Sequence, residues 1–145
     1  MSHSANGRCS EDTVKNKAYV ALLAASTLWC LAIVAAPAFD PSWVYGFFHR
    51  ICHQDPARSW HLAGEPFAVC IRCASIYFAF TASLWLGMKT SVRWLRLSIM
   101  LMLCEFAVAR IAFDNAMLRS FSGILVGLSA APFVKQAIEE IREAM

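Results

Sequence analysis

Three cysteines and a nearby histidine carry the strongest chemical signal in the sequence. Cys70 and Cys73 form a C-x-x-C pair, and Cys52 lies eighteen positions before Cys70. Thiolate sulfur and imidazole nitrogen are the usual ligands of structural zinc, four to a closed tetrahedral site. Either His49, three residues before Cys52, or the adjacent His53 completes such a set. The spacing therefore predicts a Cys3His metal site, with zinc as the first choice and iron or copper also compatible with sulfur ligands.

The same cysteines also suit thiol–disulfide exchange. At the start of a helix, Cys70 and Cys73 fall on one face, and the helix N-terminus together with Arg72 favours their thiolate forms. Cys52 would then relay electrons to a partner or a quinone. Parity favours metal, because a disulfide between two of three cysteines leaves an odd thiol, whereas a metal uses all three. A membrane thiol–disulfide oxidoreductase remains the alternative, so the pattern leaves open whether the protein is an enzyme.

Further polar residues surround this cluster and are candidates to support a ligand or a substrate. They are His49, Arg58, His61, Arg72, Tyr77 and Glu105. Glu105 lies inside an apolar run, where ionisable side chains are functional candidates. It has no partner three or four positions away, so we expect it to meet Arg72 or the Tyr77 hydroxyl of another helix. A third interpretation, metal transport or delivery, places Glu105 along the route of a captured soft metal.

The composition indicates a membrane protein. The 145 residues are 59% hydrophobic and 16% charged, against about 25% charged in soluble domains, and the mean hydropathy is +0.51. The net charge of +3 is modest, and the basic residues flank apolar runs. No nucleic-acid-binding motif is present, so the expected partner is the lipid bilayer and not nucleic acid.

The apolar runs predict an all-α, polytopic membrane protein with four transmembrane helices and a long first outer loop. A helical span needs about 20 apolar residues. The predicted spans are residues 18–39, 70–88, 94–113 and 118–134. A polar cytoplasmic tail (1–17) precedes them, the outer loop covers 40–69, and an amphipathic tail (135–145) follows. Residues 18–145 are expected to form a single membrane domain.

Basic residues near the spans predict the orientation of the chain. With the N-terminus inside, eight Lys and Arg residues lie on the inner side and five on the outer side, as the positive-inside rule favours. Both termini are then cytoplasmic, and the cysteine-bearing loop faces outward from a bacterial cytoplasmic (inner) membrane. Gly123 and Gly127 form a G-x-x-x-G spacing that permits close helix approach, and a homo-oligomer through these glycines is possible.

The loop and the helix that follows it carry a more specific pattern. Cys52-His53-Gln54, Arg58-Ser59, Gly64 and Cys70-x-Arg72-Cys73 with Tyr77 occur in this order. The string resembles the signature of a prokaryotic family of small predicted membrane proteins, domain of unknown function two-thousand-eighty-five. The resemblance covers about a fifth of the chain and implies that His53, and not His49, is the fourth ligand. Ala74-Ser75 stand where the family commonly has Thr-Gly. The family brings no assigned activity.

Overall fold

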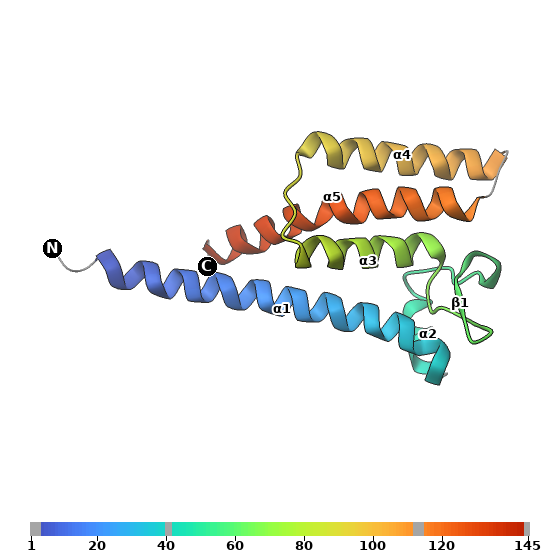
Figure 1. The fold of residues 1–145 in the computed structure, drawn as a ribbon, viewed down its shortest axis with the longest axis horizontal. Coiled ribbons are helices and arrows are strands. Elements are labelled where there is room, and N and C mark those ends of the chain that lie inside the picture. Colours follow the sequence, from blue (N-terminus) through green and yellow to red (C-terminus); the bar gives the residue numbers. More distant parts are fainter. Residues whose placement is uncertain (1–3, 40–41, 112–114, 144–145) are drawn as a thin grey trace.

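The chain is a bundle of long helices with a small folded loop at one end (Figure 1). The computed structural model describes residues 4–39, 42–111 and 115–143. The long helices are α1 (Ser4–Phe39), α3 (Ile71–Trp85), α4 (Val92–Ile111) and α5 (Ala116–Glu143). The loop contains α2 (Ser42–Phe48), the 3-10 turn η1 (Pro56–Arg58) and a hairpin of β1 (His61–Leu62) and β2 (Glu65–Pro66). The predicted helical architecture is confirmed apart from this hairpin, whose strands have two residues each.

The helices alternate in direction, so the loop lies at one end of the bundle and both termini lie toward the other (Figure 1). The helix α3 packs most extensively against α5, which also contacts α4, while α1 lies against α3. Two boundaries differ from the sequence-based expectation. The helix α1 begins at Ser4, so it includes most of the polar N-terminal tail. The helix α5 continues to Glu143, so the amphipathic tail extends the last helix. Residues 112–113 of the predicted third span lie outside the described residues.

Two helices in the described part of the chain are long and apolar enough to cross a membrane. They cover Lys17–Phe39, with a mean hydropathy of 2.1, and Ala116–Ile138, with 1.4. The helix α3 has 15 residues, or about 22 Å at 1.5 Å per residue, which is short of the ~30 Å hydrocarbon layer. The helix α4 is long enough but carries three arginines and a glutamate. Length and composition therefore single out α1 and α5.

The close contact between α3 and α5 depends on two glycines. A Cβ atom on Gly123 would lie 2.8 Å from the Arg72 carbonyl oxygen, and one on Gly127 would overlap the Ile76 carbonyl oxygen. Both glycines are buried. The sequence suggested this G-x-x-x-G pair as a contact with a second copy. In the structure the helix that approaches these glycines is α3 of the same chain.

The loop has its own small apolar core, which holds it on the bundle. Val44 and Phe48 of α2 pack with Ile33 of α1 and with Val69, which precedes α3. The hairpin turn has positive φ angles at Ala63 (55°) and Gly64 (94°), as in the type I′ turns that fit the twist of two-residue hairpins. The Tyr45 hydroxyl donates to the Pro66 carbonyl at 2.7 Å, which joins the hairpin to α2. This core sets the position of the residues between Cys52 and Cys70.

Candidate metal centre

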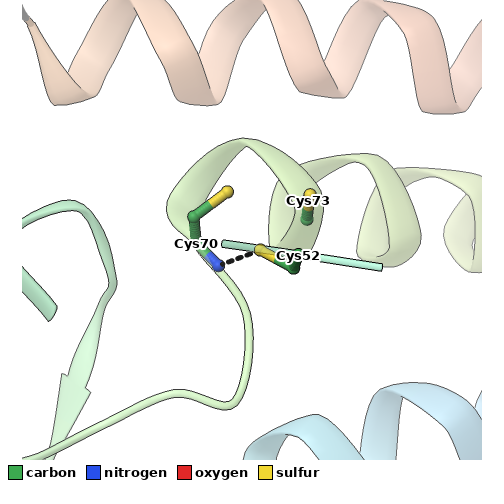
Figure 2. A group of neighbouring side chains, drawn as sticks. All are labelled: Cys52, Cys70 and Cys73. Carbon is green, nitrogen blue, oxygen red and sulfur yellow. Dashed lines mark hydrogen bonds between the residues drawn. The ribbon is translucent and has the colours of Figure 1, made fainter. Parts of the chain in front are cut away.

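Two segments of the chain bring the three predicted cysteines together (Figure 2). Cys70 is the N-cap of α3 and Cys73 lies in its first turn, so the C-x-x-C spacing puts both at the same helix end. Cys52 arrives from the turn that follows α2. The three sulfur atoms all lie within 4.8 Å of one another. The Cys70 backbone N–H donates a hydrogen bond to the Cys52 sulfur at 3.2 Å, so Cys52 satisfies a free N–H group of the helix N-terminus.

Gln54 holds Cys52 in this position, a role that the sequence analysis did not assign to it. Its backbone adopts a left-handed conformation with φ 49°. Its side-chain nitrogen donates to the carbonyl oxygens of Tyr45, at 2.8 Å, and Ala68, at 2.7 Å. Those two residues lie on opposite sides of the loop, so one amide ties the loop's start to its end. The signal that could have predicted this role is the Cys-His-Gln motif, in which the Gln54 side chain carries two N–H donors.

The electrostatics of the cluster favour a thiolate at Cys52. Hydrogen bonds from the Cys70 and Cys73 thiols, and then from the Cys70 N–H, hold the pKa of Cys52 well below the ordinary thiol range, although burial opposes them. A thiolate, not a thiol, is both the metal ligand and the nucleophile. Cys52 is only 7% exposed, so its charge is shielded from water and available to a bound cation or to the neighbouring sulfurs.

No histidine joins the three sulfurs among the residues that the structure describes. His49, in the turn directly after α2, and His61, in β1, are both exposed. His53 is also exposed, but it lines a cavity of about 500 Å³ together with Cys70. The structure thus brings together three of the four predicted ligands. His53, which shares a cavity wall with one of them, stays a prediction as the fourth.

Glu105 meets Arg72, as expected from the sequence. The Arg72 Nη2 atom lies 2.6 Å from Glu105 Oε2, which also accepts a hydrogen bond from the Ser122 hydroxyl at 3.3 Å. The Glu105 side chain is 8% exposed. The contact links α4 to the first turn of α3 and to α5, so it orients the C-x-R-C segment. Tyr77 instead packs edge-to-face against Trp29 of α1, with ring centroids 5.7 Å apart.

Arg58 lies beside the cluster and contacts Asp55, with 3.3 Å between Arg58 Nε and Asp55 Oδ2. Asp55 also caps η1 by accepting from the Ala57 N–H at 3.0 Å. The sequence analysis missed Arg119, in the first turn of α5, which is 6% exposed and lines the same cavity as Arg58. In the sequence it is one of the five basic residues on the predicted outer side. The signal that could have identified Arg119 as a candidate is its position at the start of an apolar helix.

Comparisons with known proteins agree that the chain is a membrane protein. A family model described as a predicted membrane protein, DUF2085, matches residues 52–133, a range that begins at the first cysteine of the cluster. An uncharacterized protein of Methanocaldococcus jannaschii is 34% identical over 73 residues. That match covers 42% of this chain and 47% of the relative, so the chain spans about half the length of the curated relative it matches. No solved structure matches the chain.

Proposed function

The chain belongs to the DUF2085 family of predicted membrane proteins, and on that premise we propose that it is a metal-binding membrane protein whose outward-facing Cys52, Cys70 and Cys73 bind zinc or a similar ion. The observation that carries the proposal is the meeting of three sulfurs, from segments eighteen residues apart, within 4.8 Å of one another. Free cysteines converge in this way where they share one cation or exchange disulfides. The metal uses all three sulfurs.

The sulfur geometry supports zinc. Zinc–sulfur bonds of about 2.3 Å in a tetrahedron place sulfurs about 3.8 Å apart. The observed limit of 4.8 Å exceeds this by at most about 1.0 Å (4.8 − 3.8), so small side-chain rotations bring the cluster to bonding geometry. His53 supplies the fourth ligand in this proposal, because it follows Cys52 directly and lines a cavity with Cys70. The ion would pin the loop to the N-terminus of α3.

Metal analysis of the full-length protein tests the site. Protein purified in reducing, chelator-free buffer should carry about one metal ion per chain. Cys73→Ser should lose it. Cys104→Ser is the matched control, because Cys104 is exposed on α4 and outside the cluster. His53→Ala should weaken binding, whereas His61→Ala should not. Reduced wild-type protein without bound zinc, iron or copper would sink the proposal.

We further propose four membrane crossings by α1, α3, α4 and α5, with both termini in the cytoplasm of a bacterial inner membrane. The alternation of the helices supports this, because an even number of passes leaves both termini on one side (Figure 1). The α3–α4 connection lies at the end of the bundle opposite the loop (Figure 1). Lys89 belongs to this connection, Arg93 to the first turn of α4, and Lys135 lines a cavity with Lys89, as the positive-inside rule requires. Local thinning of the bilayer accommodates the short helix α3.

Topology is measured with two reporters. Alkaline phosphatase fused to the C-terminus should be inactive, and an epitope inserted between Ala63 and Gly64 of the exposed hairpin should bind antibody in intact spheroplasts. The same epitope after Lys89 should bind only after permeabilisation. An active C-terminal phosphatase fusion would reverse the orientation. If antibody reaches both epitopes from the same side of the membrane, the proposed crossing by α3 is contradicted.

Thiol–disulfide exchange is the second candidate, favoured by the cysteine pair at the α3 N-terminus. Cys70 is the N-cap, and its N–H already stabilises negative charge on the Cys52 sulfur. Oxidation of Cys70 and Cys73 to a disulfide releases two electrons and two protons, which a partner disulfide or a quinone would accept. Acid trapping and alkylation in cells distinguishes the candidates. A Cys70–Cys73 disulfide in a large fraction of the protein supports exchange, and fully reduced cysteines at every growth stage exclude it.

A further inference from the structure

A cavity of about 440 Å³ borders the α3–α4 connection, at the end of the bundle opposite the loop (Figure 1). Lys89 of this connection and Lys135 of α5 both line it. We propose that this cavity holds the phosphate headgroup of an anionic lipid. The site goes beyond the proposed metal centre, because it lies at the other end of the bundle and its ligand-binding groups are ammonium groups.

An aromatic ring holds the Lys135 ammonium group at the cavity. Its Nζ atom lies 4.4 Å from the centroid of the Tyr19 ring of α1, which is a favourable cation–π contact. The Tyr19 hydroxyl donates to the Leu84 carbonyl oxygen of α3, so three helices determine the position of this one cation. Lys135 and Lys89 form no ion pair with another residue that the structure describes. Because Lys135 is already positioned, it loses less conformational freedom when it binds a phosphate.

The α3–α4 connection brings the second ammonium group to the same cavity. The chain turns directly after α3, where Gly87 has a positive φ of 58° and its N–H donates to the Leu84 carbonyl oxygen at 3.1 Å. The Thr90 hydroxyl donates to the Ser129 carbonyl oxygen of α5 at 3.0 Å. These contacts tie the connection to both neighbouring helices. Lys89, which lies between them, is therefore kept beside the cavity although its side chain is exposed.

An adjoining cavity favours a lipid over a water-soluble phosphate. This second cavity has a volume of about 520 Å³. The residues that line both cavities are Met88, Lys89 and Thr90. Apolar side chains of Trp94, Leu125 and Leu128 line the second cavity away from the first. A ligand with a charged head and an apolar chain fits this pair, with its phosphate beside the lysines and its hydrocarbon against the leucines.

Two exposed tryptophans indicate that this end of the bundle lies at the level of the lipid headgroups. Trp85, the last residue of α3, is 64% exposed, and Trp94, in the first turn of α4, is 62% exposed. Tryptophan is enriched at the membrane–water interface. The choice of leaflet rests on the proposed topology, in which this end faces the cytoplasm. Basic pockets between transmembrane helices on that side bind anionic headgroups.

Lipid retention by the full-length protein tests the site. Protein freed of lipid in detergent is incubated with equal amounts of phosphatidylglycerol and phosphatidylcholine that carry the same acyl chains. Native mass spectrometry then reports which lipid stays bound. Glycerol 3-phosphate is added afterwards as a competing water-soluble phosphate. Wild-type protein should retain phosphatidylglycerol in preference to phosphatidylcholine, and millimolar glycerol 3-phosphate should not displace it.

The two lysines should account for this preference. Lys89→Gln and Lys135→Gln should each weaken retention of phosphatidylglycerol about fivefold, and the double variant about 25-fold, the effect expected of basic residues at an anionic membrane surface. Lys17→Gln is the matched control, because Lys17 is an exposed lysine of α1 that lines neither cavity. A general effect of net charge would weaken retention equally in all three single variants.

The outcomes separate this site from the other proposals. Equal retention of both lipids by wild-type protein, or lysine variants that behave like Lys17→Gln, would overturn it. Displacement by glycerol 3-phosphate would identify a water-soluble phosphate as the ligand and overturn the lipid assignment. Retention in detergent does not depend on orientation, so a reversed topology would change the leaflet and leave the site intact. Lys89→Gln and Lys135→Gln should keep the bound metal of the wild-type protein, which makes loss of lipid and loss of metal distinguishable failures.

Discussion

Replacing Gly127 by alanine should separate α3 from α5, and the size of the effect follows from the contacts. The added Cβ would overlap the Ile76 carbonyl oxygen and lie 2.9 Å from both Ala79 Cβ and Phe80 N. Ordinary carbon contacts are about 3.5–4.0 Å. Each of these atoms belongs to the backbone or is a Cβ, so no side-chain rotation removes the overlap. The helices must move apart by roughly 1 Å.

Two opposing terms set the change in the free energy of unfolding for Gly127→Ala. Alanine is favoured over glycine within a helix by about 1 kcal/mol. Against this, overpacking costs about 1–3 kcal/mol, and a gap of about 0.5–1 Å forfeits a quarter to a half of each dispersion contact along the interface. The interface between α3 and α5 is the most extensive in the bundle. We therefore expect Gly127→Ala to lower the free energy of unfolding by about 1–3 kcal/mol net of the helix gain.

Gly46→Ala is the matched control, because Gly46 lies in α2 and an added Cβ would meet nothing within 4 Å. It should leave stability unchanged or raise it by about 0.5–1 kcal/mol. Gly123→Ala should fall between the two, since its closest contacts are 2.8 Å to Arg72 O and 3.0 Å to Ser75 Cβ.

Thermal unfolding in detergent measures the stability of these variants. In a chain of this size, each kcal/mol of lost stability lowers the melting temperature by about 2–4 °C. Size-exclusion chromatography reports the oligomeric state. If Gly127→Ala is as stable as Gly46→Ala, the packing argument is wrong. If it instead dissociates an oligomer without changing the stability of the monomer, the glycines serve an intermolecular contact.

Two further substitutions probe the supports of the cysteine cluster. Glu105→Gln removes the charge facing Arg72, whose Nε atom is also buried without a partner among the described residues. It should cost about 2 kcal/mol in the free energy of unfolding, below the ~3–5 kcal/mol of a fully buried pair, because Arg72 is partly exposed. A loss no larger than that of the exposed control Glu65→Gln would contradict the role of this ion pair. Gln54→Ala removes two hydrogen bonds, to the carbonyl oxygens of Tyr45 and Ala68. It should cost about 2–4 kcal/mol in the free energy of unfolding and speed alkylation of Cys52. Unchanged alkylation would show that Gln54 does not position this cysteine.

Local patterns in the sequence were enough to predict the helices and the members of the cluster. Long uncharged runs predict helices at any position in a fold, because apolar side chains leave water and the backbone must satisfy its own hydrogen bonds. The C-x-x-C spacing determines that Cys70 and Cys73 share a helix end. Glu105 has no partner within its own helix, so the sequence predicted a contact with Arg72 or with the Tyr77 hydroxyl, and the structure shows the contact with Arg72. These inferences depend on spacing or on charge within one segment.

The tertiary structure decided what depends on the meeting of distant segments. The sequence cannot show which helix packs against the two glycines, and the structure shows that it is α3 of the same chain. It could not reveal that Gln54 ties Tyr45 to Ala68, or that Arg58, Arg110 and Arg119 line one cavity. The physical reason is that periodicity orients a side chain only about its own helix axis. Which groups then become neighbours is set by helix packing and by the path of the loop.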